Sequence, residues 1–109
     1  MGFLFHGRTQ YEFDDRTLAH LKIAIAQKLR NQESFFLNWS IPTEEGSGRM
    51  SIWLSPSSEL AFHFQAARAP ELNVVWVKVL ASLAYSPRGL VVMSEAEAEQ
   101  YAAKNPDLL

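Results

Sequence analysis

The side chains with the widest chemical range on this chain are three histidines and two consecutive aspartates. Asp14-Asp15 could act as an acid/base couple, and His6, His20 and His63 offer nitrogen ligands for zinc. Acids ahead of a helical segment are far more often caps, because a carboxylate accepts from the free amides of the first turn. The histidines share no ligand spacing. We therefore expect a helix cap and predict neither a metal site nor a cofactor.

Nucleophilic catalysis finds no support in the motifs either. The chain has no cysteine, which excludes disulfides, thiolate metal sites and cysteine catalysis. No serine lies in a Gly-x-Ser-x-Gly elbow. The run Gly46-Ser47-Gly48-Arg49 resembles a phosphate loop, but it lacks the Gly-Lys-Ser/Thr ending and precedes a strand-like segment. A hairpin tip is the favoured interpretation of this run.

A different set of side chains combines aromatic rings with hydrogen-bonding groups. Between residues 33 and 65 the chain alternates in the manner of strands, so that one face of the sheet would carry the apolar residues of the core. The opposite face would carry the aromatic rings and the hydrogen-bonding side chains. Rings among polar groups suit stacking on bases or on a nucleotide, or contact with a partner protein. The alternative is that the C-terminal helix or a second subunit covers this face. The predicted binding residues are Phe36, Asn38, Arg49, Trp53, His63 and Gln65.

The elements that would position these residues can be read from periodicity and from turn residues. The stretch 33–65 predicts three successive antiparallel strands, because each limb alternates and is bounded by Pro, Gly or Ser. Apolar residues at helical spacing predict two main helices, and Ser94 with Glu97 forms a capping-box pattern ahead of a third. The expected segments are an opening hairpin over 2–13, helices over 14–31, 70–85 and 94–104, and a strand over 89–93.

The resulting order is β-β-α-β-β-β-α-β-α, in which strands outnumber helices and hairpin-length connections dominate. This order predicts an α+β fold: an antiparallel sheet of about six strands with the two main helices packed on one face. At 109 residues the chain is long enough for one domain and too short for two. We assign residues 1–93 to that domain and residues 94–109 to an acidic C-terminal helical extension.

The second main helix is apolar on almost every side. Trp76 lies in the middle of the side that we expect to face the core. The opposite side would expose a second apolar patch unless something covers it, and a two-fold dimer would bury the same patch from both subunits. We therefore predict a homo-oligomer with an interface made of Val74, Val77, Ala81 and Tyr85.

Charge and hydropathy restrict the remaining partners. The net charge of the chain is −2. Residues 94–109 carry a charge of −3, and residues 1–93 carry +1. A body so close to neutrality lacks the clustered basic face typical of duplex DNA binding. No apolar run approaches the length of a membrane span, and the first residues do not form a signal peptide. We expect a cytoplasmic protein that does not bind membranes.

Four groups of residues carry a resemblance to known proteins: 13–21, 28–30 with 33–35, 47–49 with 51–54, and 70–73. Together they resemble a family of short actinobacterial proteins of unknown function, many of which carry the automatic label ATP-dependent DNA ligase. The resemblance spans roughly residues 1–93. Where members of that family tend to have a histidine after a Trp-Leu pair, this chain has Ser55, so a role for that histidine does not carry over.

The ligase label would require a lysine that attacks the nucleotide, within a Lys-x-Asp-Gly context. None of the four lysines, Lys22, Lys28, Lys78 and Lys104, has that context, and a nucleotidyltransferase core needs far more chain. We therefore predict a non-catalytic interaction module, with a protein or single-stranded nucleic acid as partner and a ligase-associated role as one form of it. The alternative is a small-molecule or nucleotide-binding domain that uses the sheet face around Trp53 and His63.

Overall fold

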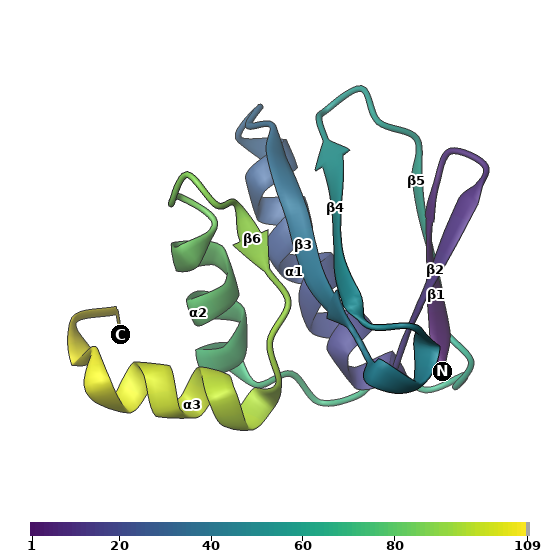
Figure 1. Cartoon of the computed structure of the whole chain (residues 1–109). Coiled ribbons are helices and arrows are strands. Elements are labelled where there is room, and N and C mark those ends of the chain that lie inside the picture. Colours follow the sequence, from purple (N-terminus) through teal and green to yellow (C-terminus); the bar gives the residue numbers. More distant parts are fainter. Residues whose placement is uncertain (109) are drawn as a thin grey trace.

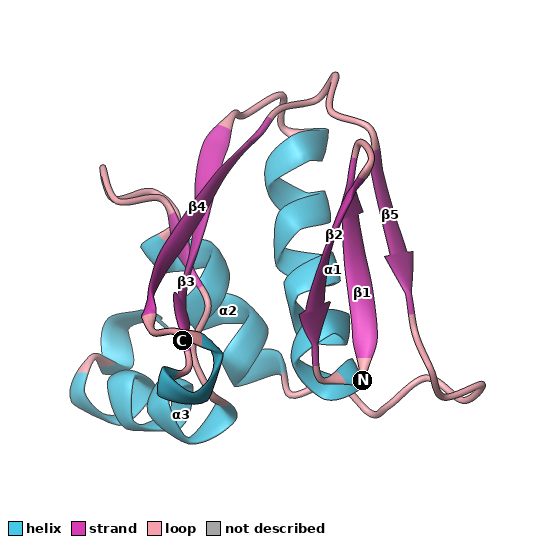
Figure 2. Ribbon diagram, turned by 45° about the vertical axis from the view of Figure 1, so that its right-hand side comes forward, coloured by secondary structure: helices cyan, strands magenta, loops and turns pink. Residues whose placement is uncertain are grey.

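The computed structural model describes residues 1–108 and divides six strands between two small sheets. The order of elements is the predicted one, and the α+β class is confirmed. The single sheet of about six strands is wrong, because the strands form the two three-stranded sheets β2-β1-β5 and β4-β3-β6. Figure 2 shows the two sheets splayed on either side of α1.

The N-terminal sheet is built around the opening hairpin. Strands β1 (Gly2–His6) and β2 (Thr9–Phe13) pair in antiparallel register through the turn at Gly7. The predicted meander fails at its third strand: β5 (Leu60–His63) does not continue from β4 but pairs antiparallel with the other edge of β1. Strand periodicity carries no information about which partner a strand takes when that partner is distant in sequence.

The second sheet keeps the other half of the meander. Strands β3 (Phe35–Ile41) and β4 (Gly48–Leu54) form an antiparallel hairpin, with a short 3₁₀ turn over Thr43–Glu45 near its tip. The last strand, β6 (Leu90–Val91), adds to β3 in parallel. This sheet is therefore mixed, and β4 is one of its edges.

The long helix α1 (Asp15–Arg30) begins where the paired aspartates predicted it. Asp14 is the N-cap and accepts from the backbone amide of Thr17 at 3.1 Å. Asp15 turns elsewhere: it accepts from the amides of Gln65 at 3.2 Å and Ala66 at 2.8 Å. The two carboxylates therefore serve separate structural tasks and do not form an acid/base couple.

The second helix, α2 (Val74–Leu83), begins later than the predicted 70–85 because Asn73 caps it. The Asn73 side chain accepts from the amides of Val75 and Trp76, which ends the preceding irregular segment. The third helix, α3 (Glu95–Lys104), has the predicted capping box at Ser94 and packs against α2, as Figure 1 shows.

The core lies between α1, α2 and the inner faces of both sheets. Its fully buried members include Leu4 of β1, Leu21 of α1, Leu37 of β3 and Leu80 of α2, which shows that every layer contributes. Trp39 joins the two sheets, because its ring packs edge-on against Tyr11 and Phe13 with centroids 5.2 and 5.1 Å apart. No helix within residues 1–108 is long and apolar enough to cross a membrane.

Candidate binding face

The outer face of the sheet β4-β3-β6 carries the most prominent exposed aromatic pair. Phe36 and Trp53 are opposite each other in the β3–β4 register and are 45% and 50% exposed. Their rings meet edge-to-face with centroids 5.0 Å apart, an arrangement that aromatic quadrupoles favour. Their neighbours Phe35 and Leu54 are buried, so strand alternation alone directs both rings outward.

Beyond the aromatic pair, the same face becomes polar. The next opposed pair is Asn38 with Ser51, and the one after it is Ser40 with Arg49. A shallow concavity of about 520 Å³ begins here, bordered by Arg49 and by Arg88 from the turn before β6, and no acidic side chain lines it. Strand spacing puts Trp53 and Arg49 about 13 Å apart at their Cα atoms, on one face of one strand.

Asn38 has a structural task on this face. Its amide nitrogen donates to the carbonyl oxygens of Arg88 at 2.6 Å and Leu90 at 3.3 Å, and its amide oxygen accepts from the hydroxyl of Ser51. The amide is thus occupied within the chain, so Asn38 positions Arg88 beside the sheet instead of offering its own hydrogen bonds to a ligand. Sequence reasoning missed Arg88, whose only local signal is the turn composition Ser86-Pro87-Arg88-Gly89.

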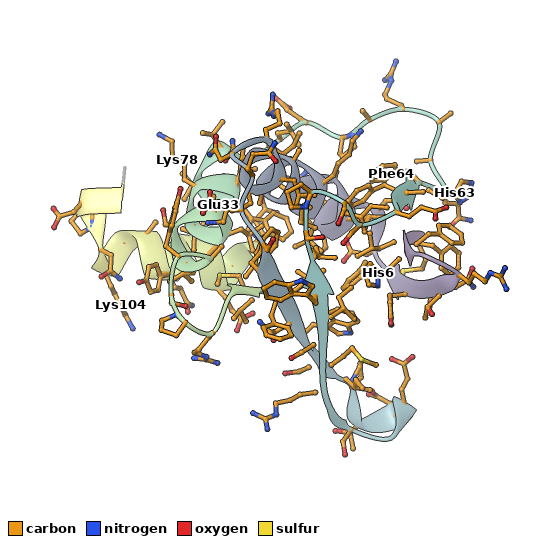
Figure 3. All side chains as sticks on the ribbon, turned by 90° about the horizontal axis from the view of Figure 1, so that it is seen from above. His6, Glu33, His63, Phe64, Lys78 and Lys104 are labelled. Carbon is orange, nitrogen blue, oxygen red and sulfur yellow. The ribbon has the colours of Figure 1, made fainter. Side chains whose placement is uncertain are left out.

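Two of the predicted binding residues lie elsewhere. His63 is on β5, where it pairs with Phe3 of β1, and Gln65 follows that strand and accepts from the N-terminal ammonium group of Met1 at 2.8 Å. Figure 3 shows His63 and His6 on the same side of the molecule, and both belong to the N-terminal sheet. The predicted grouping of Trp53 with His63 and Gln65 is wrong, because the third strand joins the other sheet. Phe36, Asn38, Arg49 and Trp53 do share one face.

The four residues of the predicted interface on α2 differ in how far the chain itself buries them. Val77 is 7% exposed within the chain, so its expected place on an open patch is wrong. Helix α3 packs against α2, and the alanines Ala98 and Ala102 are buried there; such small side chains allow two helices to approach closely. Val74 and Tyr85 stay exposed at 61% and 69%, whereas Ala81 is partly buried.

The three histidines have unlike surroundings. His20 is completely buried between α1 and α2, where its ring stacks on Trp76 with centroids 4.3 Å apart. His6 and His63 belong to the N-terminal sheet, and His63 is exposed. Across residues 1–108, no three histidine, aspartate or glutamate side chains lie close enough together to hold a metal ion.

The fold and this face together define a small α+β module with an exposed surface of aromatic and cationic side chains. A family model described as a domain of unknown function (DUF7882) matches residues 1–95. The chain belongs to that family. The searches of curated proteins and of solved structures gave no match.

Proposed function

We propose that this protein is a non-catalytic binding module that holds single-stranded nucleic acid on the outer face of the sheet β4-β3-β6. The observation that carries the proposal is the continuity of the exposed Phe36–Trp53 pair with the concavity beside Arg49 and Arg88. Exposed rings on a sheet stack on unpaired bases, while arginines neutralise the phosphates that follow them.

Charge supports single strands over duplex DNA. The three strands of this sheet carry Arg49 and no acidic residue, and Arg88 is the second cation at the concavity. Two phosphate contacts give a weak salt dependence, unlike the six to ten contacts of a typical duplex binder. Stacking must therefore supply most of the affinity, and the expected site covers roughly two or three bases.

The resemblance to proteins labelled ATP-dependent DNA ligase gives this activity a proposed setting. A module with this face would act beside a ligase, on the unpaired end of its substrate, and would not itself transfer a nucleotide. The lysine contexts of the chain favour an accessory over a catalyst. A cytoplasmic location is part of this proposal. Radiolabelled ATP with magnesium should leave the protein unlabelled, and covalent AMP on any lysine would contradict an accessory role.

Fluorescence anisotropy with labelled oligo(dT) and oligo(U) tests the binding proposal. Trp53→Ala should weaken binding by about 1–3 kcal/mol, the usual value of one base–aromatic stack. Arg49→Gln should reduce the slope of log affinity against log salt by about 0.7. Tyr85→Ala and Arg8→Gln are the matched controls, because both residues are exposed and belong to neither β3, β4 nor β6. Equal affinities for wild type and Trp53→Ala would refute the proposal.

Nucleotide binding is the alternative use of the same face. It now depends on Trp53 with Arg49, because His63 belongs to the other sheet. One ring pair and two arginines would suit a mononucleotide with its phosphate. Competition distinguishes the two: a mononucleotide that displaces the oligonucleotide at equal molar concentration supports the alternative, whereas an affinity that rises with strand length supports the main proposal.

Self-association stays a separate proposal, carried by the exposed side chains of Val74 and Tyr85. Val77 belongs to the predicted interface but is 7% exposed, so Val77→Asp would place a carboxylate in a buried position and destabilise the fold. Val74→Asp is the suitable variant. Sedimentation of the unmodified chain as a monomer at micromolar concentration would exclude the dimer.

A further inference from the structure

A second cavity lies between α1 and the irregular segment that joins β5 to α2. It has a volume of about 430 Å³, within the range of small-molecule sites. Its lining is mainly apolar with a few charged side chains: Asp15, Arg16, Ala19, Lys22, Ile23, Phe64, Ala66, Ala67, Arg68, Ala69, Pro70 and Leu72. Figure 3 locates Phe64 next to His63, at the end of β5.

The segment 65–71 is fastened to α1 near both of its ends. Asp15 accepts from the backbone amides of Gln65 and Ala66, at 3.2 and 2.8 Å. At the other end, the guanidinium of Arg16 donates to the carbonyl oxygen of Glu71 at 2.9 Å. Between these ties lie the small side chains of Ala67, Ala69 and Pro70 together with Arg68, so most of the segment leaves space against the helix instead of filling it. The cavity is thus held open by specific hydrogen bonds.

The apolar lining of the cavity accounts for two large apolar side chains, Ile23 and Leu72, that are not part of the core. Ile23 lies on the polar side of α1 and is only partly buried, and Leu72 is 44% exposed before α2 begins. Both line this cavity together with Phe64. Large apolar side chains that converge on one concavity are what an apolar ligand needs.

The charges at the cavity are unequally compensated. Arg16 is neutralised by Glu95, with nitrogen–oxygen distances of 3.0 and 2.8 Å, and Asp15 lies 3.9 Å from the N-terminal ammonium group. Lys22 and Arg68 form no ion pair within the part of the chain that the structure describes. The Lys22 ammonium is 5.8 Å from the centroid of the Phe64 ring, so a cation stands directly beside the apolar lining. The free charge at this cavity is therefore positive.

We infer that this cavity binds a small amphipathic monocarboxylate, with its apolar body against Ile23, Phe64 and Leu72 and its carboxylate toward Lys22 and Arg68. Binding of the apolar body would remove this lining from water. The carboxylate would provide an anionic partner for Lys22 and Arg68. The inference is independent of the proposed nucleic-acid function, because the two sites share no residue.

Titration calorimetry with octanoate, octanol and octyltrimethylammonium tests the assignment, because the three probes share an apolar chain and differ in the charge of the head group. Octanoate should bind at least tenfold tighter than octanol, and the cation should not bind. The double variant Lys22→Gln/Arg68→Gln should abolish the advantage of octanoate over octanol. Arg8→Gln/Lys104→Gln removes two exposed cations outside the cavity and should preserve that advantage.

A second pair of variants examines the apolar lining. Ile23→Glu places an anion in the cavity and should abolish octanoate binding, whereas Ile23→Gln should weaken it only severalfold; Ile23 is not fully buried, so both chains should fold. Near-ultraviolet circular dichroism checks that they do. Octanol or octyltrimethylammonium binding as tightly as octanoate would overturn the inference. Equal octanoate binding by wild type and Ile23→Glu, or no binding of octanoate to the wild type, would overturn it as well.

Discussion

The backbone amide of Asn73 donates a hydrogen bond to Nε2 of His20 at 2.8 Å, which joins the start of α2 to α1. Nδ1 of the same ring lies 2.7 Å from the carbonyl oxygen of Arg16. A carbonyl can only accept, so Nδ1 carries the proton and Nε2 is the acceptor. Sequence spacing places His20 on the polar side of α1, yet it is the most tightly constrained histidine of the chain.

Replacing His20 with alanine should destabilise the fold by about 2–4 kcal/mol, because the change leaves the backbone amide of Asn73 without its acceptor and removes a buried ring stacked on Trp76. The urea midpoint measures the loss. His63→Ala is the matched control, since that ring is exposed, and its midpoint should stay within about 0.5 kcal/mol of wild type. Equal midpoints for both variants would contradict the role given to His20.

Stability should fall in acid through Glu95. Hydrogen bonds from Arg16 and then from Asn73 lower the pKa of the Glu95 carboxyl to about 2, from an ordinary value of 4.5. The folded state therefore favours the charged carboxylate, and this contribution is complete above pH 4.5 and lost as the pH falls toward 2. Glu95→Gln should be less stable than wild type at pH 7, with the difference shrinking toward pH 2.

Urea unfolding at several pH values measures this effect. Glu44→Gln is the control, because Glu44 is exposed in the turn between β3 and β4. Its stability should follow the wild-type pH profile. The size of the Glu95 effect should be modest, since water screens a partly exposed pair. A difference between wild type and Glu95→Gln that does not change with pH would contradict the assignment.

Gly89 and Gly46 form a matched pair for backbone strain. Both have a positive φ, +83° and +104°, but a Cβ added at Gly89 would lie 2.5 Å from the carbonyl oxygen of Phe36, whereas one at Gly46 would meet nothing within 4 Å. Gly46→Ala should cost about 1 kcal/mol for the unfavourable φ alone. Gly89→Ala should cost clearly more, since β6 must move away from β3. Equal losses in urea midpoint would show that the close approach to Phe36 is unimportant.

Trp76 and Trp53 should differ sharply in their contribution to stability. Trp76 is 2% exposed, stacks on His20, and donates from its indole nitrogen to the Met93 carbonyl oxygen at 3.2 Å. Trp76→Ala should therefore cost about 3–5 kcal/mol. Trp53, half exposed on the binding face, should lose less than about 1 kcal/mol. An unchanged denaturation midpoint for Trp76→Ala would refute its place in the core.

The local sequence was sufficient to predict the order of the elements, the caps of two helices and the alternation of side chains along the strands. Asp14 and Ser94 cap helices because their side chains reach backbone amides three residues onward, a purely local geometry. Alternation likewise placed Phe36 and Trp53 on one outer face, since side chains on a strand point to opposite sides in turn. These features depend on residues only a few positions apart along the chain, so the local sequence specifies them.

Tertiary structure alone decided which edges and surfaces the elements share. Pairing of β5 with β1 instead of β4 removed His63 from the predicted site, and the return of β6 to β3 brought Arg88 onto it. The packing of α3 on α2 buried Val77, and the ties to segment 65–71 created the cavity beside Ile23. Contacts between residues dozens of positions apart depend on how all layers close around one core, and no local pattern specifies that closure.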